Sequence, residues 1–215
     1  MKLMFIEAKS KLKIQLNEKQ VKQLPTKLGI VTTVQHVDNL DKIIKQLKQP
    51  VLGKGKQVHE PQILGCDVSA ALNIKNKVSA FLYIGTGRFH PIEIALKTNK
   101  PVYIFNPVNN TLNKLKTEDI ERTKKRKKGS LIKFLSSDRI GVLISTKPGQ
   151  NKLKQAQKLK EKYKDKEFFF LLFNTLNFNE LENYPFIECY VNTACPRLYD
   201  DYDKFPKSVI DLEDI

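Results

Sequence analysis

The side chains best suited to chemistry in this sequence follow a series of short apolar runs. The loops read "TTVQH" at 32–36, "GCDVS" at 65–69, "GTGRFH" at 85–90, "STKPGQ" at 145–150 and "NTACPR" at 192–197. Together they contain two of the three histidines, two of the three cysteines and two of the five arginines. Cysteine, histidine and arginine are not ordinary turn residues. We therefore expect a functional site built from these loops.

The cysteines predict metal chemistry. Cys66 and Cys195 each follow an expected strand and precede an expected helix, where backbone N–H groups favour the thiolate that a metal ligand needs. Cys189 lies inside the apolar run "FIECYV", which predicts a buried core thiol. An odd number of cysteines without a CxxC pair disfavours both a disulfide framework and a zinc ribbon. Two distant thiolates indicate an interdomain iron–sulfur cluster more than a zinc site, although two ligands are not enough for one.

Two glycine-containing loops could hold an anion. "GTGRFHP" has Gly85 and Gly87 at the first two glycine positions of a dinucleotide fingerprint but His90 at the third, so no nicotinamide cofactor is expected. Pro91 suits the first turn of a helix, and a glycine-lined helix N-terminus beside Arg88 suits a carboxylate or a phosphate. A plain tight turn remains the alternative.

The other loops are more ambiguous. "STKPGQ" repeats the arrangement with Lys147 and Gly149, but Pro-Gly is turn chemistry by itself. His36 could equally be a residue at the start of a helix. His59 lies in a polar stretch and is assigned no role.

The hydrophobic pattern predicts an α/β fold. Continuous apolar runs are typical of strands buried on both faces of a parallel sheet, and the stretches between them have helical periodicity. The expected strands are 27–33, 61–66, 78–85, 138–146, 166–174 and 186–192, with a further terminal strand over 2–8. A basic segment at about 114–130 divides the series. We expect two similar βαβ-type domains with mainly parallel sheets, 1–115 and 116–215, with the candidate ligands at the carboxyl ends of strands.

Composition limits the remaining function classes. The chain has 215 residues, of which 40% are hydrophobic and 28% charged, so a folded core is expected. No apolar run approaches the roughly 18 residues of a membrane span and no signal peptide is evident, which predicts a cytoplasmic protein. The net charge is +15, yet only five basic residues are arginine. We expect the run "ERTKKRKKGS" at 121–130 to be a solvated face or loop, without specific nucleic-acid binding.

Several of these motifs together resemble a known family. "TVQHVDNLDKI", "QILGCDVSAA", "FLYIGTGRFHPIEIAL", "ISTKPGQ" and "VNTACPR" followed by "DD" are similar, in order and spacing, to the archaeal-type diphthamide synthase, 2-(3-amino-3-carboxypropyl)histidine synthase. The resemblance runs from about residue 3 to the C-terminus. It implies α/β domains around a [4Fe-4S] cluster, with Cys66 and Cys195 as ligands and Cys189 as a core residue.

The resemblance also implies a reaction. One iron would be left open for S-adenosylmethionine, whose 3-amino-3-carboxypropyl group is transferred as a radical to a histidine of translation elongation factor 2, with methylthioadenosine as the other product. The resemblance assigns no general base on this chain. The candidate contacts to S-adenosylmethionine are Gln35, His36, Gly85, Thr86, Gly87, Arg88, Lys147, Gly149 and Gln150.

The family's first domain and its cysteine have no counterpart in this sequence. We therefore expect a separate polypeptide to supply both, an electron donor to reduce the cluster, and a dimer of such complexes as one arrangement. Two other interpretations stay open. The chain could be a non-catalytic structural subunit of such a complex, or a basic RNA- or ribosome-associated α/β protein with inert cysteines.

Overall fold

The computed structural model describes residue 4 and residues 6–215 of the chain. The chain divides into two compact units, Met1–Ile120 and Glu121–Ile215. The domain boundary expected from the sequence, between residues 115 and 116, lies slightly before the boundary in the structure. No helix in the described part of the chain is long and apolar enough to cross a lipid bilayer.

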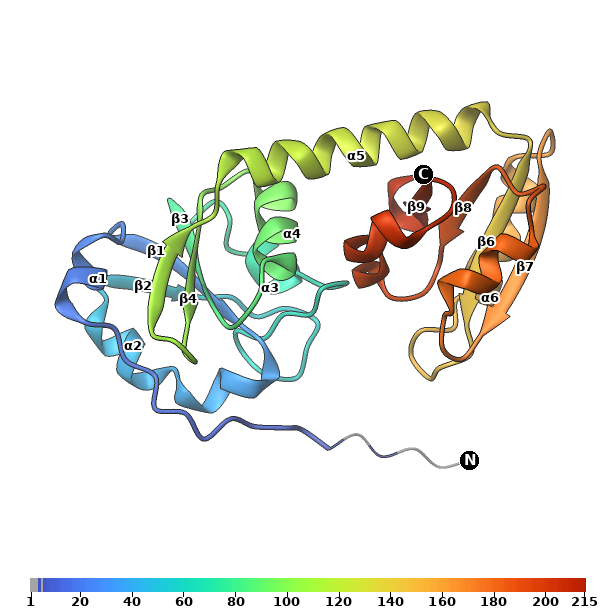
Figure 1. The fold of residues 1–215 in the computed structure, drawn as a ribbon. Coiled ribbons are helices and arrows are strands. Elements are labelled where there is room, and N and C mark those ends of the chain that lie inside the picture. The colour runs from blue at the N-terminus through green and yellow to red at the C-terminus, as the bar shows by residue number, and fades with distance from the viewer. Residues whose placement is uncertain (1–3, 5) are drawn as a thin grey trace. The chain divides into compact units, whose positions relative to one another are not determined.

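The first unit is built on a sheet with the strand order β2-β1-β3-β4-β5, coloured blue to yellow-green in Figure 1. The pairs β1–β2, β1–β3 and β3–β4 are parallel, and β4–β5 is antiparallel. The elements are α1 (Glu18–Lys22), β1 (Lys27–Thr32), the 3₁₀ helix η1 (Val34–Asn39), α2 (Asp41–Gln46), β2 (Gln49–Leu52), α3 (Ser69–Leu72), β3 (Ala80–Ile84), α4 (Phe89–Thr98), β4 (Val102–Asn106) and β5 (Thr111–Lys114).

Both faces of this sheet are covered, as the continuous apolar runs predict. On one face Phe81 of β3 packs in a core with residues of α3 and α4. On the other face Leu82 packs with Ile43 of α2 and with the segment around Ile14. Successive strand residues therefore point to opposite cores, which explains why β3 is apolar throughout.

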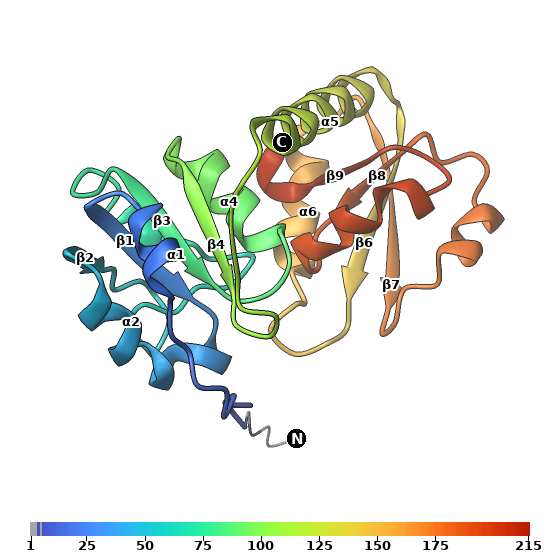
Figure 2. The ribbon, with the colours of Figure 1, turned by 60° about the vertical axis from the view of Figure 1, so that its left-hand side comes forward.

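The second unit has the strand order β7-β6-β8-β9, with every pair parallel. Its strands and helix α6 can be followed in Figure 2. The elements are α5 (Thr117–Ser136), which begins in the first unit, β6 (Arg139–Ser145), α6 (Leu153–Lys162), β7 (Glu167–Phe173), η2 (Phe178–Asn183), β8 (Cys189–Asn192), η3 (Pro196–Lys204), β9 (Val209–Asp211) and η4 (Leu212–Asp214). Phe134 of α5 and Leu159 of α6 pack in the core on one face of this sheet.

The α/β prediction with two mainly parallel sheets is confirmed. Two of the expected strands were wrong. Residues 61–66 form only single-residue bridges, because the chain turns back at Leu64–Asp67. The strand expected over 2–8 lies partly outside the described residues, and Met4 and residues 6–8 are not in a strand. The basic run 121–130 lies in α5, and most of its residues are exposed, so it is a solvated helix face as expected and not a loop.

Candidate functional site

In the first unit, the strand order reverses between β1 and β3. At such a point the loops after the two strands leave in opposite directions, and in open α/β sheets ligands bind in the crevice between them. The two strand ends are fastened together, because the Thr32 hydroxyl donates a hydrogen bond of 2.7 Å to the carbonyl oxygen of Ile84. The "TTVQH" and "GTGRFH" loops are therefore neighbours at the carboxyl edge of this sheet.

The "GTGRFH" loop needs its glycines. Gly87 has a φ of +78°, a left-handed conformation that residues with a Cβ rarely adopt. A Cβ at Gly85 would lie 2.5 Å from Oη of Tyr83. The Tyr83 hydroxyl donates a hydrogen bond of 3.4 Å to the Thr86 carbonyl oxygen, and its ring stacks on His90 with 5.6 Å between the centroids. Tyr83 thus shapes the loop, while Thr86 and Gly87 are exposed.

Cys66 lies in a tight turn rather than at a strand end, which corrects the expectation from the sequence. The backbone N–H groups of Leu64 and Asp67 each donate to the carbonyl oxygen of the other, at 2.9 and 3.0 Å. Gly65 permits close packing, since a Cβ there would lie 1.9 Å from the ring of Phe89. Phe89 opens α4, so this contact places the turn against the "GTGRFH" loop. The Cys66 side chain is exposed.

Asp67 holds the other side of this turn. Its carboxylate accepts hydrogen bonds from the side-chain amide of Gln57 (2.6 Å) and from the backbone N–H of Ser69 (3.0 Å). Burial by itself would raise the pKa of Asp67, but these hydrogen bonds and the nearby charge of Lys56 outweigh it and lower the pKa. The carboxylate is therefore ionised at neutral pH and the turn is held on both sides.

The two residues of the "TTVQH" loop that were predicted to contact S-adenosylmethionine differ in burial. Both lie in η1, but Gln35 is exposed whereas His36 is only 7% exposed. Burial lowers the pKa of His36, so its imidazole is neutral at neutral pH. His36 lies in the first turn of the 3₁₀ helix η1. This position agrees with the alternative prediction, that His36 is a residue at the start of a helix.

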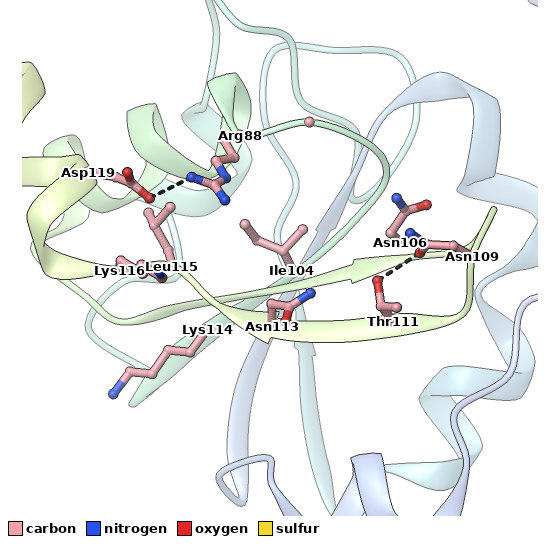
Figure 3. A pocket seen from close by; sticks show the side chains of 11 residues that line it. Arg88, Ile104, Asn106, Asn109, Thr111, Asn113, Lys114, Leu115, Lys116 and Asp119 are labelled. Atoms are coloured by element: carbon pink, nitrogen blue, oxygen red, sulfur yellow. Dashed lines mark hydrogen bonds and ion pairs between the residues drawn. The ribbon is translucent and has the colours of Figure 1, made fainter.

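Arg88 forms part of a polar cavity of about 320 Å³ in the first unit (Figure 3). Arg88 is the N-cap residue of α4. It therefore lies at a helix N-terminus, which is the position expected of a residue that binds a carboxylate or a phosphate. Its Nη1 atom donates to Oδ2 of Asp119 at 3.1 Å. Gly87 lines the same cavity, whereas Gly85 and Thr86 do not. The remaining lining residues are Ile104, Asn106, Asn109, Thr111, Asn113, Lys114, Leu115 and Lys116.

The second unit has an equivalent strand reversal, between β6 and β8. A cavity of about 470 Å³ lies there and brings together the predicted residues Lys147, Gln150 and Cys195. The other lining residues are Ser145, Phe173, Asn174, Thr175, Leu176, Phe178, Ala194, Arg197, Leu198 and Asp201. Residues from the ends of three neighbouring strands therefore converge on one cavity, as the rule for parallel sheets requires.

The "STKPGQ" loop is a tight turn that also reaches this cavity. The Gln150 N–H donates to the Lys147 carbonyl oxygen at 3.1 Å, and Gly149 has a φ of +77°. This matches a type II turn with Pro148 and Gly149 at the central positions. Gly149 does not line the cavity, so it provides the turn while Lys147 and Gln150 provide side chains.

Cys195 is held by a network at the end of β8. The side-chain amide of Asn192 donates to the Cys195 carbonyl oxygen (3.0 Å) and to Oδ1 of Asp211 (2.7 Å), and its Oδ1 accepts from the Ala194 N–H (3.0 Å). Cys195 is the N-cap residue of η3, and Pro196 follows as the first helical residue. Its side chain is partly exposed. The backbone at this position is therefore fixed while the thiol can be reached.

Cys189 has the opposite environment, and its prediction as a core residue is confirmed. It is the first residue of β8 and is fully buried, in the same core as Ile140 of β6 and Leu159 of α6. Burial raises the pKa of its thiol to about 12. A neutral, inaccessible thiol cannot serve as a ligand without unfolding this core.

Residues that follow β7 were not predicted as site residues from the sequence. Asn174 and Thr175 line the second cavity, and so do the rings of Phe173 and Phe178. Arg197 was visible in the "NTACPR" loop but was not a candidate. The available signal was the polar dipeptide directly after the run "EFFFLLF", which is the same strand-end position that identified the other loops.

The donor atoms fit partial ligation of an iron–sulfur cluster. Iron–sulfur clusters are held by cysteine thiolates, and Cys66 and Cys195 are accessible thiols on fixed backbone. No group of three or more histidine, cysteine, aspartate or glutamate side chains suited to a metal ion occurs within the described residues. The described part of the chain therefore presents two accessible thiols and no complete metal site.

Comparison with known proteins decides the family. The model for diphthamide synthesis proteins matches residues 1–214. The chain belongs to this family. The 2-(3-amino-3-carboxypropyl)histidine synthase of Pyrococcus horikoshii is 31% identical over 205 residues, covering 91% of this chain and 58% of that protein. The enzyme of the same name from Methanocaldococcus jannaschii is 28% identical over 191 residues, covering 87% of this chain and 50% of that protein.

Solved structures agree with the family assignment. The chain superimposes on the crystal structure of Dph2 from Pyrococcus horikoshii with a TM-score of 0.79 at 28% identity, covering 92% of this chain and 58% of that one. A second structure of that protein, with a 4Fe-4S cluster, gives a TM-score of 0.78. The chain thus spans 50–58% of the length of these archaeal proteins.

Proposed function

We propose that this chain is a subunit of a [4Fe-4S] enzyme that transfers the 3-amino-3-carboxypropyl group of S-adenosylmethionine to a histidine of translation elongation factor 2, the first step of diphthamide biosynthesis. The observation that carries the proposal is the division of the cysteines. Cys66 and Cys195 are accessible on fixed backbone, whereas Cys189 is sealed in a core. Membership in the diphthamide synthesis family and the cluster in the Pyrococcus structure support it.

Cys66 and Cys195 would hold the cluster as thiolates, together with a third thiolate from a separate polypeptide. When bound, the cluster would supply the electron that breaks the bond between the sulfonium sulfur and the methionine γ-carbon of S-adenosylmethionine, which releases methylthioadenosine. The 3-amino-3-carboxypropyl radical would add to the imidazole, and the adduct would lose one proton and one electron to give the product. An external donor would reduce the cluster before the reaction.

The other side chains position the substrate. Arg88 presents a guanidinium for the carboxylate of the methionine portion, because a planar fork matches a carboxylate with two hydrogen bonds. Lys147 and Gln150 reach the cavity that contains Cys195 and are available to the other half of the substrate. Gln35 is exposed beside the β1 edge. The chain thus contributes binding and orientation, while the cofactors carry the chemistry.

The test is anaerobic reconstitution with iron and sulfide. Alone, the chain should hold substoichiometric, oxygen-labile iron, because two protein ligands leave the cluster incompletely held. With a partner that carries the third cysteine, the visible absorption of a cluster should become stable and S-adenosylmethionine should be cleaved to methylthioadenosine. Cys66→Ala and Cys195→Ala should each abolish this product without preventing partner binding.

Cys189→Ala is the matched control and should retain the cluster and the activity. If the reduced wild-type complex formed no methylthioadenosine in the presence of elongation factor 2, the chain would be a structural subunit. Loss of iron from Cys189→Ala alone would reverse the assignment of the cysteines.

A further inference from the structure

Residues 7–10 form a strap that lies against η1, the 3₁₀ helix after β1. The Ser10 N–H donates a hydrogen bond of 2.7 Å to the carbonyl oxygen of Gln35. The Ser10 carbonyl oxygen accepts a hydrogen bond of 2.7 Å from the side-chain amide of Asn39. Both partners belong to η1, so one end of the strap is fixed to the loop that contains the candidate contact Gln35.

The other end of the strap is joined to His59, for which the sequence predicted no role. Nε2 of His59 lies 2.6 Å from Oε1 of Glu7. Hydrogen bonds from His59 and Lys9 lower the pKa of Glu7, so its carboxylate is ionised at neutral pH. Because an ionised carboxylate can only accept hydrogen bonds, Nε2 of His59 is the donor. We refer to this contact between Glu7 and His59 as the clasp.

The segment that contains His59 also holds the Cys66 turn. Gln57 lies two residues before His59, and its side-chain amide donates a hydrogen bond of 2.6 Å to Oδ2 of Asp67. Asp67 in turn closes the turn around Cys66 through its backbone hydrogen bonds. Residues 53–60 form no helix or strand, so side-chain contacts of this kind determine where the segment lies.

A continuous series of contacts therefore runs from η1 through the strap and the clasp to the Cys66 turn. We propose that His59 is a positioning residue, which acts through Glu7 to fix the Cys66 turn relative to the loop that contains Gln35. The inference rests on the proposed function, in which Cys66 is a cluster ligand. Groups that orient a ligand from outside the coordination shell strengthen metal binding, and the clasp would have this effect on the Cys66 thiolate.

The clasp acts locally, because it lies at the surface. The side chains of His59 and Glu7 are 31% and 41% exposed. Solvent screens a pair at such a position, so its loss should change the stability of the whole unit little. Local opening of a turn depends on few contacts, however, and there the loss of one contact is measurable.

Hydrogen exchange of the full, iron-free chain tests the connection. Glu7→Ala and His59→Ala should each raise the exchange rate of the Asp67 N–H about threefold, because the segment beside the turn is no longer held. Glu60→Ala is the matched control, since it removes an exposed carboxylate next to His59 that is not part of the clasp. The Thr193 N–H, in the second unit, is the internal reference and should not change. Thermal unfolding verifies that each variant is folded.

A reversed pair distinguishes the clasp from a general loss of structure. Glu7→Lys alone should accelerate exchange at Asp67, whereas Glu7→Lys combined with His59→Glu should restore the wild-type rate, because the two side chains again attract each other. In the reconstituted complex, Glu7→Ala and His59→Ala should release iron to a chelator about threefold faster than the wild type, and the reversed pair should release it at the wild-type rate.

Three results would overturn the inference: unchanged exchange at Asp67 in Glu7→Ala and His59→Ala, faster exchange that the reversed pair does not restore, or faster exchange with wild-type iron release. None of them affects the proposed function, which methylthioadenosine formation by the wild-type complex tests separately. Conversely, faster exchange and iron release that the reversed pair restores, in a complex that forms no methylthioadenosine, would retain the role of His59 and refute the proposed reaction.

Discussion

Arg88 and Asp119 form an ion pair at the rim of the cavity in the first unit, with 3.1 Å between Nη1 and Oδ2 (Figure 3). The two partners differ in exposure, since the arginine side chain is 65% exposed and the aspartate 17%. Asp119 lies in the first turn of α5, so a comparatively buried carboxylate on a helix pairs with one nitrogen of an exposed guanidinium. We expect the other guanidinium nitrogens to be available to a ligand.

Asp119→Asn should therefore weaken the binding of S-adenosylmethionine. Fixing a long side chain costs about 1 kcal/mol, so loss of this preorganisation should reduce affinity about fivefold. Methylthioadenosine has no carboxylate, and its affinity should not change. Direct binding measurements with both ligands provide the test, with Glu118→Gln, a substitution of the exposed neighbouring residue, as the control. Tighter binding of S-adenosylmethionine to Asp119→Asn would show that Asp119 competes with the ligand instead.

The three cysteines should differ in reactivity. In the reduced, iron-free native protein, iodoacetamide should modify Cys66 and Cys195, whereas Cys189 should react only after unfolding, because it is buried and its thiol has a pKa of about 12. Peptide mapping by mass spectrometry identifies the modified residues. Rapid native labelling of Cys189 would contradict its placement in the core.

Cys189→Ala should lower the free energy of unfolding by about 1 kcal/mol, as expected for a modest truncation in a packed core. Cys66→Ala is the matched control, since its side chain is exposed and it should change stability little. Denaturant unfolding of both variants measures the difference. Equal stabilities would mean that the core around Cys189 is not tightly packed.

Glu188 should make stability depend on acid pH. Its carboxylate accepts hydrogen bonds from the backbone N–H groups of Asp138 and Arg139 and from the Arg139 guanidinium, and these lower its pKa from 4.5 to about 2. A depressed folded-state pKa gives stability that is present above pH 4.5 and is lost as the pH falls towards 2. The difference in melting temperature between wild type and Glu188→Gln should shrink over that interval. Glu182→Gln, at an exposed position, should show no such trend.

The basic face of α5 should bind RNA only weakly and without sequence preference. Lys125 and Lys128 are exposed on this helix, and binding through such lysines is dominated by counterion release. The logarithm of the binding constant should fall by ~0.7 per phosphate contact for each decade of salt on single strands. Fluorescence anisotropy with unrelated RNA sequences measures this slope, which should decrease in a Lys125→Gln, Lys128→Gln variant. Tight, selective binding at physiological salt would favour an RNA-associated function.

The sequence by itself determined the strands that are buried on both faces. The runs that became β3 and β6 are continuously apolar, and their side chains are buried on both faces of the sheet. The run that became β7 is equally apolar, but β7 lies at the edge of its sheet and its side chains are only partly buried. The distinction between Cys189 and Cys195 also came from local sequence, since one lies inside an apolar run and the other just after it. The strand over 61–66 failed because an apolar run with a glycine and a proline can close into a turn as readily as it can extend.

Only the tertiary structure decided which strand ends lie together. The order β7-β6-β8-β9 places the loop after β7 beside Lys147 and Cys195, so Asn174 and Phe178 line the same cavity. The local sequence marks Asn174 as a residue at a strand end, but it does not show which other strand ends lie beside it. The contact of Gly65 with Phe89 likewise fixes the Cys66 turn against the "GTGRFH" loop. Strand order depends on the packing of helices against the whole sheet, and a one-dimensional pattern of apolar residues does not encode it.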